Sequence, residues 1–318
     1  MIGLRKAAAV VAAAAVASTG AVVAHATAPG KNGEIAFKLA LGAPSRLGVV
    51  NADGSGLRKL PRTKQVSDDD PDWSPSGSTI AFTRCPLGNG RCHVDAMRPD
   101  GSGLKQLGPA NDDRAFPSWA PDGKHIAYVR SWGGVQHDEI KYSALYVMTP
   151  TGGGAHLLVN PMNAQPYAGD VGHSSWSPDG KQLVLEVTHS PLGDPANGHA
   201  LFLVNADGSG LKQLTPWSLN AGGKPDWSPD GSRILFRAPT KNERGNLYTI
   251  APDGSGLKQL THYAAPVPVV SAGSFSPDGK WITFAKSGSV WVMRADGTGA
   301  KQITAAGHVY TPDWGPAR

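Results

Sequence analysis

Acidic, basic, imidazole and aromatic side chains recur at matching places in this sequence, shortly before a repeated aromatic motif. The residues concerned are Asp68, Asp69, Asp70, Asp113, Arg114, Phe116, Asp170, His173, Lys224, His308 and Tyr310. Carboxylates and imidazoles that converge from separate stretches can coordinate a divalent cation, where oxygen ligands favour calcium or magnesium and added histidine favours manganese or zinc. Rings beside polar groups can instead bind a peptide, and charged loops can also serve only to keep a surface soluble.

Three of these residues are the candidate metal ligands, namely Asp70, His173 and His308. We expect no cofactor, and the alternative is one divalent cation, calcium or manganese. Two further polar groups are expected as exposed residues of long loops, away from any site: His137 to Glu139, and the pair His189 and His199.

The elements that must position these residues are set by the aromatic motif itself. Trp-Ser-Pro-Asp-Gly, or a variant of it, occurs six times, with its aromatic residue at Trp73, Trp119, Trp176, Trp227, Phe275 and Trp314. A spacing of roughly 40 to 57 residues, with several short apolar runs in each unit, is typical of a propeller blade. We expect the aromatic side chains to fill the core between neighbouring sheets.

A second signal, Asp-Gly-Ser-Gly or a variant, begins at Asp53, Asp100, Gly152, Asp207, Asp253 and Asp296. It is neither a calcium loop nor a phosphate-binding loop, because no Asp-x-Asp-x-Asp-Gly with a distal Glu occurs and no Lys-Ser or Lys-Thr follows the glycines. Proline fixes φ, aspartate bonds its own backbone and glycine accepts positive φ, so both repeated signals predict hairpin turns.

Each unit therefore predicts four strands, A to D from the axis outward. Residues 34–60 supply three strands without a preceding motif, and residues 311–314 supply one final strand. We predict an all-β, six-bladed β-propeller with four-stranded antiparallel blades, the last closed by one C-terminal strand plus three N-terminal strands. The A–B and C–D turns are short and share one face. The variable D–A and B–C connections share the other, the variable-loop face, where we expect the binding site.

The first 26 residues predict a secretory signal peptide. A basic start with Arg5 and Lys6 precedes an apolar run and the cleavage pattern Ala24-His25-Ala26. Cleavage would leave residues 27–318 as a single propeller, secreted or in the periplasm or cell envelope. The formal net charge of +5 falls when Arg5 and Lys6 are removed. The mature chain is then only mildly basic, which argues against a nucleic acid partner.

The only two cysteines, Cys85 and Cys92, flank a glycine-rich loop. In an oxidising compartment such a pair predicts a local disulfide. A metal pair would need further ligands, and only His93 is near in the sequence.

The two motifs in alternation resemble the TolB-type propeller repeat, a WD-like repeat that also occurs in prolyl-oligopeptidase-type peptidases and in some pectin-fragment lyases. The resemblance covers residues 31–318. It implies protein or peptide binding at the channel mouth, as for the TolB propeller and its peptidoglycan-associated lipoprotein, although TolB carries a further N-terminal domain. The peptidases hold their nucleophile in Gly-x-Ser-x-Gly, which does not occur here, and the sequence leaves no length for a catalytic domain. The lyases imply a His-rich metal site, for which only His173 and His308 are candidates.

We therefore predict an exported, monomeric binding module without a membrane span after signal cleavage. It would recognise a protein or peptide in the envelope or outside the cell through the variable-loop face, using the residues named at the outset other than His308. The alternative is a metal-dependent lyase or hydrolase acting on an acidic or sugar substrate in the channel.

Overall fold

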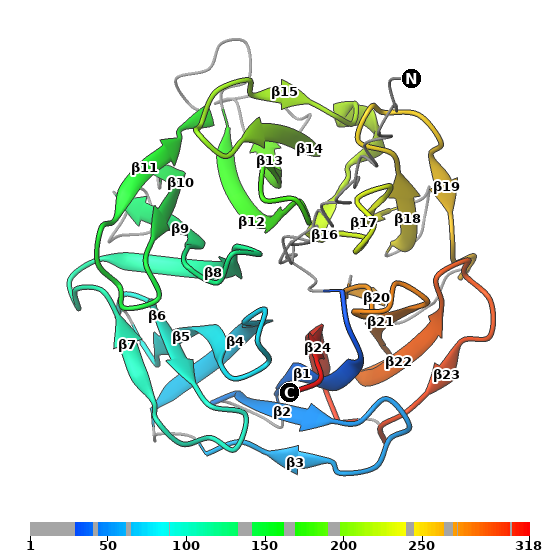
Figure 1. Cartoon of the computed structure of the whole chain (residues 1–318), viewed down its shortest axis with the longest axis horizontal. Helices are drawn as coiled ribbons and strands as arrows, with labels where there is room; N and C mark the ends of the chain where they lie inside the picture. Colours follow the sequence, from blue (N-terminus) through cyan, green and yellow to red (C-terminus); the bar gives the residue numbers. More distant parts are fainter. Residues whose placement is uncertain are drawn as a thin grey trace, which may run out of the picture.

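The computed structural model describes residues 29–40, 44–61, 65–88, 90–132, 142–161, 169–189, 198–239, 245–263, 270–271, 273–305 and 307–318. The predicted signal peptide and the group His137 to Glu139 lie outside these residues. Within them, six four-stranded antiparallel sheets surround a common axis, which confirms the predicted six-bladed propeller (Figure 1).

Five blades follow the chain from the axis outward. Their strands are β4 (Val66–Trp73), β5 (Ile80–Pro86), β6 (His93–Met97) and β7 (Lys105–Leu107); β8 (Asp113–Trp119), β9 (Ile126–Trp132), β10 (Tyr142–Met148) and β11 (His156–Val159); β12 (Asp170–Trp176), β13 (Gln182–His189), β14 (Gly198–Asn205) and β15 (Lys212–Gln213); β16 (Gly222–Trp227), β17 (Ile234–Ala238), β18 (Asn246–Ile250) and β19 (Lys258–Gln259); and β20 (Val270–Ser271), β21 (Trp281–Lys286), β22 (Ser289–Arg294) and β23 (Lys301–Gln302). A 3-10 turn, η2 (Trp217–Leu219), precedes β16.

The sixth blade joins the two ends of the chain, as predicted. β24 (Val309–Pro316) is its innermost strand, followed outward by β1 (Asn32–Leu39), β2 (Arg46–Val50) and β3 (Arg58–Lys59). Ile35 pairs with Trp314 and Ala36 with Asp313. This pairing closes the ring of blades, so the first and last sheets expose no edge to each other.

The middle strands are apolar on both faces because each blade is packed between two neighbours. In β13, Leu183, Leu185 and Val187 belong to a core cluster shared with the preceding blade. Val184, which points the opposite way, belongs to the cluster shared with the following blade. Burying an aliphatic side chain of this size contributes about 1.5 to 3 kcal/mol, so these interfaces between blades hold the ring together.

The aromatic residues of the repeated motif fill these interfaces, which confirms their predicted role. All six are at most 6% exposed. Trp176, for example, packs with Ala127 and Val147 of the preceding blade. Their rings therefore lie almost entirely within the interfaces between blades.

The motif also forms hydrogen bonds between neighbouring blades, which its sequence does not predict. The backbone N–H of Trp119 donates to Asp72 Oδ2 at 2.7 Å, and that of Trp73 donates to Asp313 Oδ2 at 2.9 Å. Phe275 N–H donates to Asp226 Oδ2 at 2.8 Å in the same way. Each aspartate directly precedes the aromatic residue of its own motif, so one carboxylate ties its blade to the next.

The Pro-Asp-Gly and Asp-Gly-Ser-Gly segments form tight turns, as predicted. Ser177 Oγ donates to Asp179 Oδ1 at 2.7 Å, and Gly180 N–H donates to the Ser177 carbonyl oxygen at 2.9 Å. Gly208 in a C–D turn has φ of 84°, and a Cβ there would lie 2.2 Å from the carbonyl oxygen of Leu158 in the preceding blade. Only glycine combines this conformation with so close an approach.

Cys85 and Cys92 form a disulfide with a Cα–Cα distance of 4.1 Å, as predicted. We expect thiol titration of the exported, unreduced and denatured protein to find no free thiol, and to find two after reduction. The double substitution Cys85→Ser and Cys92→Ser should lower the free energy of unfolding by about 2 kcal/mol, because the bridge closes a short loop. Two reactive thiols before reduction would contradict the disulfide.

Candidate functional site at the channel mouth

The innermost strands present one matching position to the axis, three residues before the motif aromatic. The described residues at this position are Asp70, Phe116, His173, Lys224 and Thr311. The register of the innermost strands is interrupted close to this position by bulges, for example between Asp69 and Asp72 in β4. Four of the five residues have φ between 46° and 63°, in the left-handed region. Such a backbone costs a non-glycine residue about 1 to 3 kcal/mol and occurs where surrounding structure enforces it, often at functional sites.

His173 on β12 connects three blades at this level. Its Nε2 lies 3.2 Å from Asp70 Oδ1 on β4, and its Nδ1 lies 3.6 Å from Glu186 Oε2 on β13. The centre of its ring is 4.2 Å from that of Phe116 on β8. Burial disfavours the imidazolium, but the two carboxylates outweigh burial and raise the pKa of His173 to about 9. His173 is therefore positively charged at neutral pH.

Glu186 is the central acidic residue of the site and was missed by sequence reasoning. Its Oε1 lies 2.8 Å from Nδ1 of His199, and its Oε2 accepts a hydrogen bond from Gly223 N–H at 3.0 Å. Burial acts to raise its pKa, but His173 and His199 hold the pKa of Glu186 well below its usual range. The available signal was one carboxylate within the apolar run from Leu183 to Val187, and a buried carboxylate must find a partner.

His189 and His199 do not belong to a long loop, contrary to the sequence-based expectation. β13 continues to His189, and His199 is the second residue of β14, paired in register with Thr188. The longer ladder brings His199 back over Glu186. The two strands pair without interruption over eight residue pairs, so they extend into the segment that was expected to be a loop.

A cavity of about 440 Å³ opens beside this cluster on the variable-loop face. Its walls are formed by Phe116, Gly172, His173, Glu186, His199, Asn220, Gly222, Gly223, Arg237 and Pro239. A Cβ on Gly222 would lie 2.5 Å from Glu186 Oε1, so glycine is required for the carboxylate to reach this place. Two of the predicted residues, Phe116 and His173, thus line a real cavity.

Lys224 lies deeper on the axis, in a cluster of carboxylates. Its Nζ donates to the Pro71 carbonyl oxygen at 2.7 Å and lies 3.6 Å from Asp313 Oδ1. Burial and the neighbouring Asp313 raise the pKa of Asp226 in this cluster to about 7. Lys224 is 8% exposed, so its charge serves the cluster and is not presented at the surface.

Asp69 and Tyr310 lie together on another side of the mouth. Asp69 forms an ion pair with Lys38 and accepts a hydrogen bond from Thr311 Oγ1 at 3.2 Å. The Lys38 Nζ is 5.8 Å from the centre of the Tyr310 ring. Asp170, at the start of β12, accepts a hydrogen bond from Ser143 Oγ at 3.1 Å.

The remaining predicted residues are placed away from the cavity. Asp68 is 0% exposed and pairs with Arg84 at 2.7 Å inside its blade. Arg114 is also buried, 2.8 Å from Asp112. Asp113 accepts a hydrogen bond from Cys92 N–H at 3.1 Å.

The three candidate metal ligands do not assemble as a set. Asp70 and His173 are in contact, whereas His308 is exposed just before β24. Among the residues that the structure describes, no group of three His, Cys, Asp or Glu side chains is placed to hold a metal ion. The imidazoles of the site are paired with carboxylates instead.

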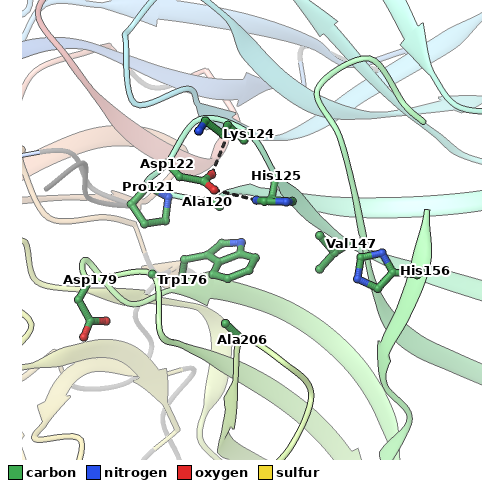
Figure 2. A pocket seen from close by; sticks show the side chains of 11 residues that line it. Ala120, Pro121, Asp122, Lys124, His125, Val147, His156, Trp176, Asp179 and Ala206 are labelled. Carbon is green, nitrogen blue, oxygen red and sulfur yellow. Dashed lines mark hydrogen bonds and ion pairs between the residues drawn. The ribbon is translucent and has the colours of Figure 1, made fainter. Parts of the chain in front are cut away.

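A larger cavity of about 560 Å³ lies on the opposite face, between the β8–β11 and β12–β15 blades. Figure 2 shows Trp176 and Val147 on its walls with Asp122, His125 and His156 around them. Its polar groups are mostly engaged in the repeated turns, since Asp122 accepts hydrogen bonds from Lys124 N–H and contacts His125 Nδ1, both at 2.8 Å. We therefore place the candidate site at the channel mouth.

Comparison with solved structures identifies the same fold in a crystal structure of TolB from Acinetobacter baumannii, with a TM-score of 0.68 and 18% identity over 90% of this chain and 67% of that one. TolB of the Tol-Pal system of Zymomonas mobilis is 37% identical over 82 residues, which are 26% of this chain and 17% of that protein. The uncharacterised peptidase YuxL of Bacillus subtilis is 30% identical over 139 residues, 42% of this chain and 19% of that protein. The chain thus spans less than a fifth of these curated relatives, and no protein-family model matches it.

The fold and the site define a six-bladed β-propeller whose innermost strands carry a polar cluster at one end of the axis. Its repeats are TolB-like, because both the propeller and the matched segments agree with proteins named TolB. No helix in the described part of the chain is long and apolar enough to cross a membrane.

Proposed function

We propose that this chain is an exported binding module that recognises a protein or peptide through the variable-loop face at the channel mouth. The observation that carries the proposal is that four innermost strands hold a non-glycine residue in the left-handed region at the same position, and that one of the four, Phe116, lines a cavity on that face. Backbone strain of this kind is retained where the positions of side chains matter for function. The likeness to TolB supports binding, and the peptidase-named relative is matched over too little of its length to supply a reaction.

The geometry suits recognition by a preformed surface. The charged side chains at the mouth are oriented by buried partners, as His173 is by Asp70 of another blade and by Glu186 of its own blade. A partner that binds here therefore meets groups whose positions are already determined, and little side-chain entropy is lost on binding.

The test is site-specific photo-crosslinking in the cells that make the protein. With p-benzoylphenylalanine at position 310, in place of Tyr310, we expect a discrete protein or peptide adduct. The matched control carries the same group at position 181, because Lys181 is 81% exposed in a turn on the opposite face. Equal adducts at both positions, or none at either in folded protein, would exclude the proposed binding face.

Export is tested on the same material by sequencing the mature N-terminus. Cleavage after Ala26 gives a chain that begins at Thr27 and is recovered outside the cytoplasm. An intact residue 1–26 segment in cytoplasmic protein would contradict the export part of the proposal.

A further inference from the structure

The side-chain hydrogen-bond acceptors of Glu186 and Asn220 in the channel-mouth cavity are occupied by donors of the protein itself. Both oxygens of Glu186 are engaged, Oε1 by His199 Nδ1 at 2.8 Å and Oε2 by Gly223 N–H at 3.0 Å. Asn220 Oδ1 accepts a hydrogen bond from the backbone N–H of His199 at 2.8 Å. These side-chain acceptors are therefore occupied, which favours a ligand that itself accepts hydrogen bonds.

His199 supplies a donor for such a ligand. Its Nδ1 faces Glu186 and Thr188, while its Nε2 makes no hydrogen bond within the described residues. Its side chain is 42% exposed, so a ligand can reach Nε2. Glu186 raises the pKa of His199, which favours the doubly protonated ring with an N–H at Nε2.

Cationic side chains outnumber carboxylates in the described part of the cavity wall. His173, His199 and Arg237 line it together with the carboxylate of Glu186, and a second carboxylate, Asp70, contacts His173. Beside them, the Phe116 ring forms an apolar surface, with its centre 4.2 Å from that of the His173 ring. The cavity therefore offers a cationic donor next to a surface for an apolar group.

We propose that this cavity binds a carboxylate of a peptide ligand, with His199 Nε2–H donating to it, Arg237 adding positive charge, and Phe116 packing against the adjoining apolar atoms. The inference rests on the proposed function and names the ligand chemistry of that same site. Two sources share this chemistry, a peptide C-terminus and an aspartate or glutamate side chain. Hydrogen bonds between an imidazolium and a carboxylate are among the stronger ones in proteins.

Binding of small matched probes to the mature protein, measured by calorimetry and by NMR of the histidine rings, tests the proposal. N-acetylphenylalanine and its amide differ only in the terminal carboxylate, and the α-amides of N-acetylglutamate and N-acetylglutamine differ only in the side-chain carboxylate. We expect at least one acid to bind about tenfold more tightly than its amide, and to shift the His199 resonances. Which acid does so identifies the source of the carboxylate.

Matched variants then assign the contact. His199→Ala should reduce the affinity for the preferred acid about tenfold and abolish its advantage over the amide. His125→Ala, which removes an exposed histidine on the opposite face, should change neither. Arg237→Gln, expected to weaken the acid selectively, serves as a second variant if His199→Ala does not fold. Equal binding of acid and amide, or no saturable binding of any probe at tens of millimolar, would overturn the proposal.

The outcomes also separate this inference from the proposed function. If crosslinking at position 310 captures a partner that neither excess acid probe nor His199→Ala displaces, the carboxylate site is wrong and the binding face stands. If the acids bind as expected and no partner is captured, the cavity chemistry stands and the protein partner does not.

Discussion

Replacing Arg84 with methionine should lower the free energy of unfolding by about 3 to 5 kcal/mol at pH 7, the largest effect we expect from one substitution. The guanidinium donates to Asp68 at 2.7 Å and 3.0 Å and to Asp95 at 3.2 Å. Asp68 is 0% exposed and Asp95 is 5% exposed. Without Arg84, two carboxylates remain buried in one blade and lose the guanidinium that pairs with both of them.

The pH dependence of this effect has a definite sign. Burial raises the pKa values of Asp68 and Asp95 even though the Arg84 guanidinium acts to lower them. Removing the guanidinium should raise both pKa values further. A carboxyl group with a raised pKa in the folded state contributes stability that is fully present below its ordinary value near 3.8 and is lost as the pH rises through the folded pKa. The deficit of Arg84→Met should therefore shrink markedly between pH 7 and about pH 4.5.

Urea unfolding of wild type and variant at both pH values measures this difference. Arg98→Met is the matched control, because Arg98 is exposed and its guanidinium bonds only Ser102 at 3.4 Å in the described structure. We expect that control to change stability by no more than about 0.5 kcal/mol. A loss for Arg84→Met that is equal at the two pH values would show that packing, not charge, is what Arg84 provides.

Glu186→Gln should lower the free energy of unfolding by about 3 kcal/mol near pH 6, the second largest effect expected. The substitution keeps the shape of the side chain but removes the charge that His173 and His199 share at 3.6 Å and 2.8 Å. It also leaves two cationic rings and Arg237 around one cavity without the carboxylate between them. The same change should weaken the binding of carboxylate probes, because His199 loses the partner that keeps it charged.

The pH range in which Glu186→Gln costs most follows from two pKa shifts of opposite sign, those of His173 and Glu186. His173, with its pKa raised from 6.5 to about 9, contributes stability that is fully present below pH 6.5 and is lost as the pH rises through 9. Glu186, with its pKa lowered, contributes stability that is present above its ordinary value of 4.5 and is lost as the pH falls through the folded pKa. The cost of Glu186→Gln should thus be greatest between about pH 4.5 and 6.5 and should decline as the pH rises from 6.5 through about 9.

Thermal or urea unfolding across pH 4 to 10 checks this profile. Glu34→Gln provides the control, since Glu34 pairs with the partly exposed Arg58 at the periphery, where such pairs contribute about 1 kcal/mol or less. An equal cost for the two variants, or a pH-independent cost for Glu186→Gln, would refute the central position of Glu186 in the site.

The sequence by itself determined the scaffold. Six aromatic motifs in alternation with six glycine turns predicted the number of blades, their strands and the closure by β24, and all of these are observed. The Cys85–Cys92 disulfide and the burial of Trp73 and its counterparts were also predictable. These features depend on local chemistry and spacing, such as the φ preferences of proline and glycine or the reach of one short loop, which need no knowledge of distant partners.

The tertiary structure alone decided which polar residues meet. Asp68, Asp69 and Asp70 are consecutive, yet they contact Arg84 within the blade, Lys38 of the closing blade and His173 across the axis, respectively. Glu186 and His199 are absent from any motif, and their pairing required the long β13–β14 ladder. Side chains alternate along a strand, and a bulge at the axis reverses that alternation. The direction of each carboxylate therefore depends on register and on a partner elsewhere in the sequence, which for Asp70 is His173, 103 residues away.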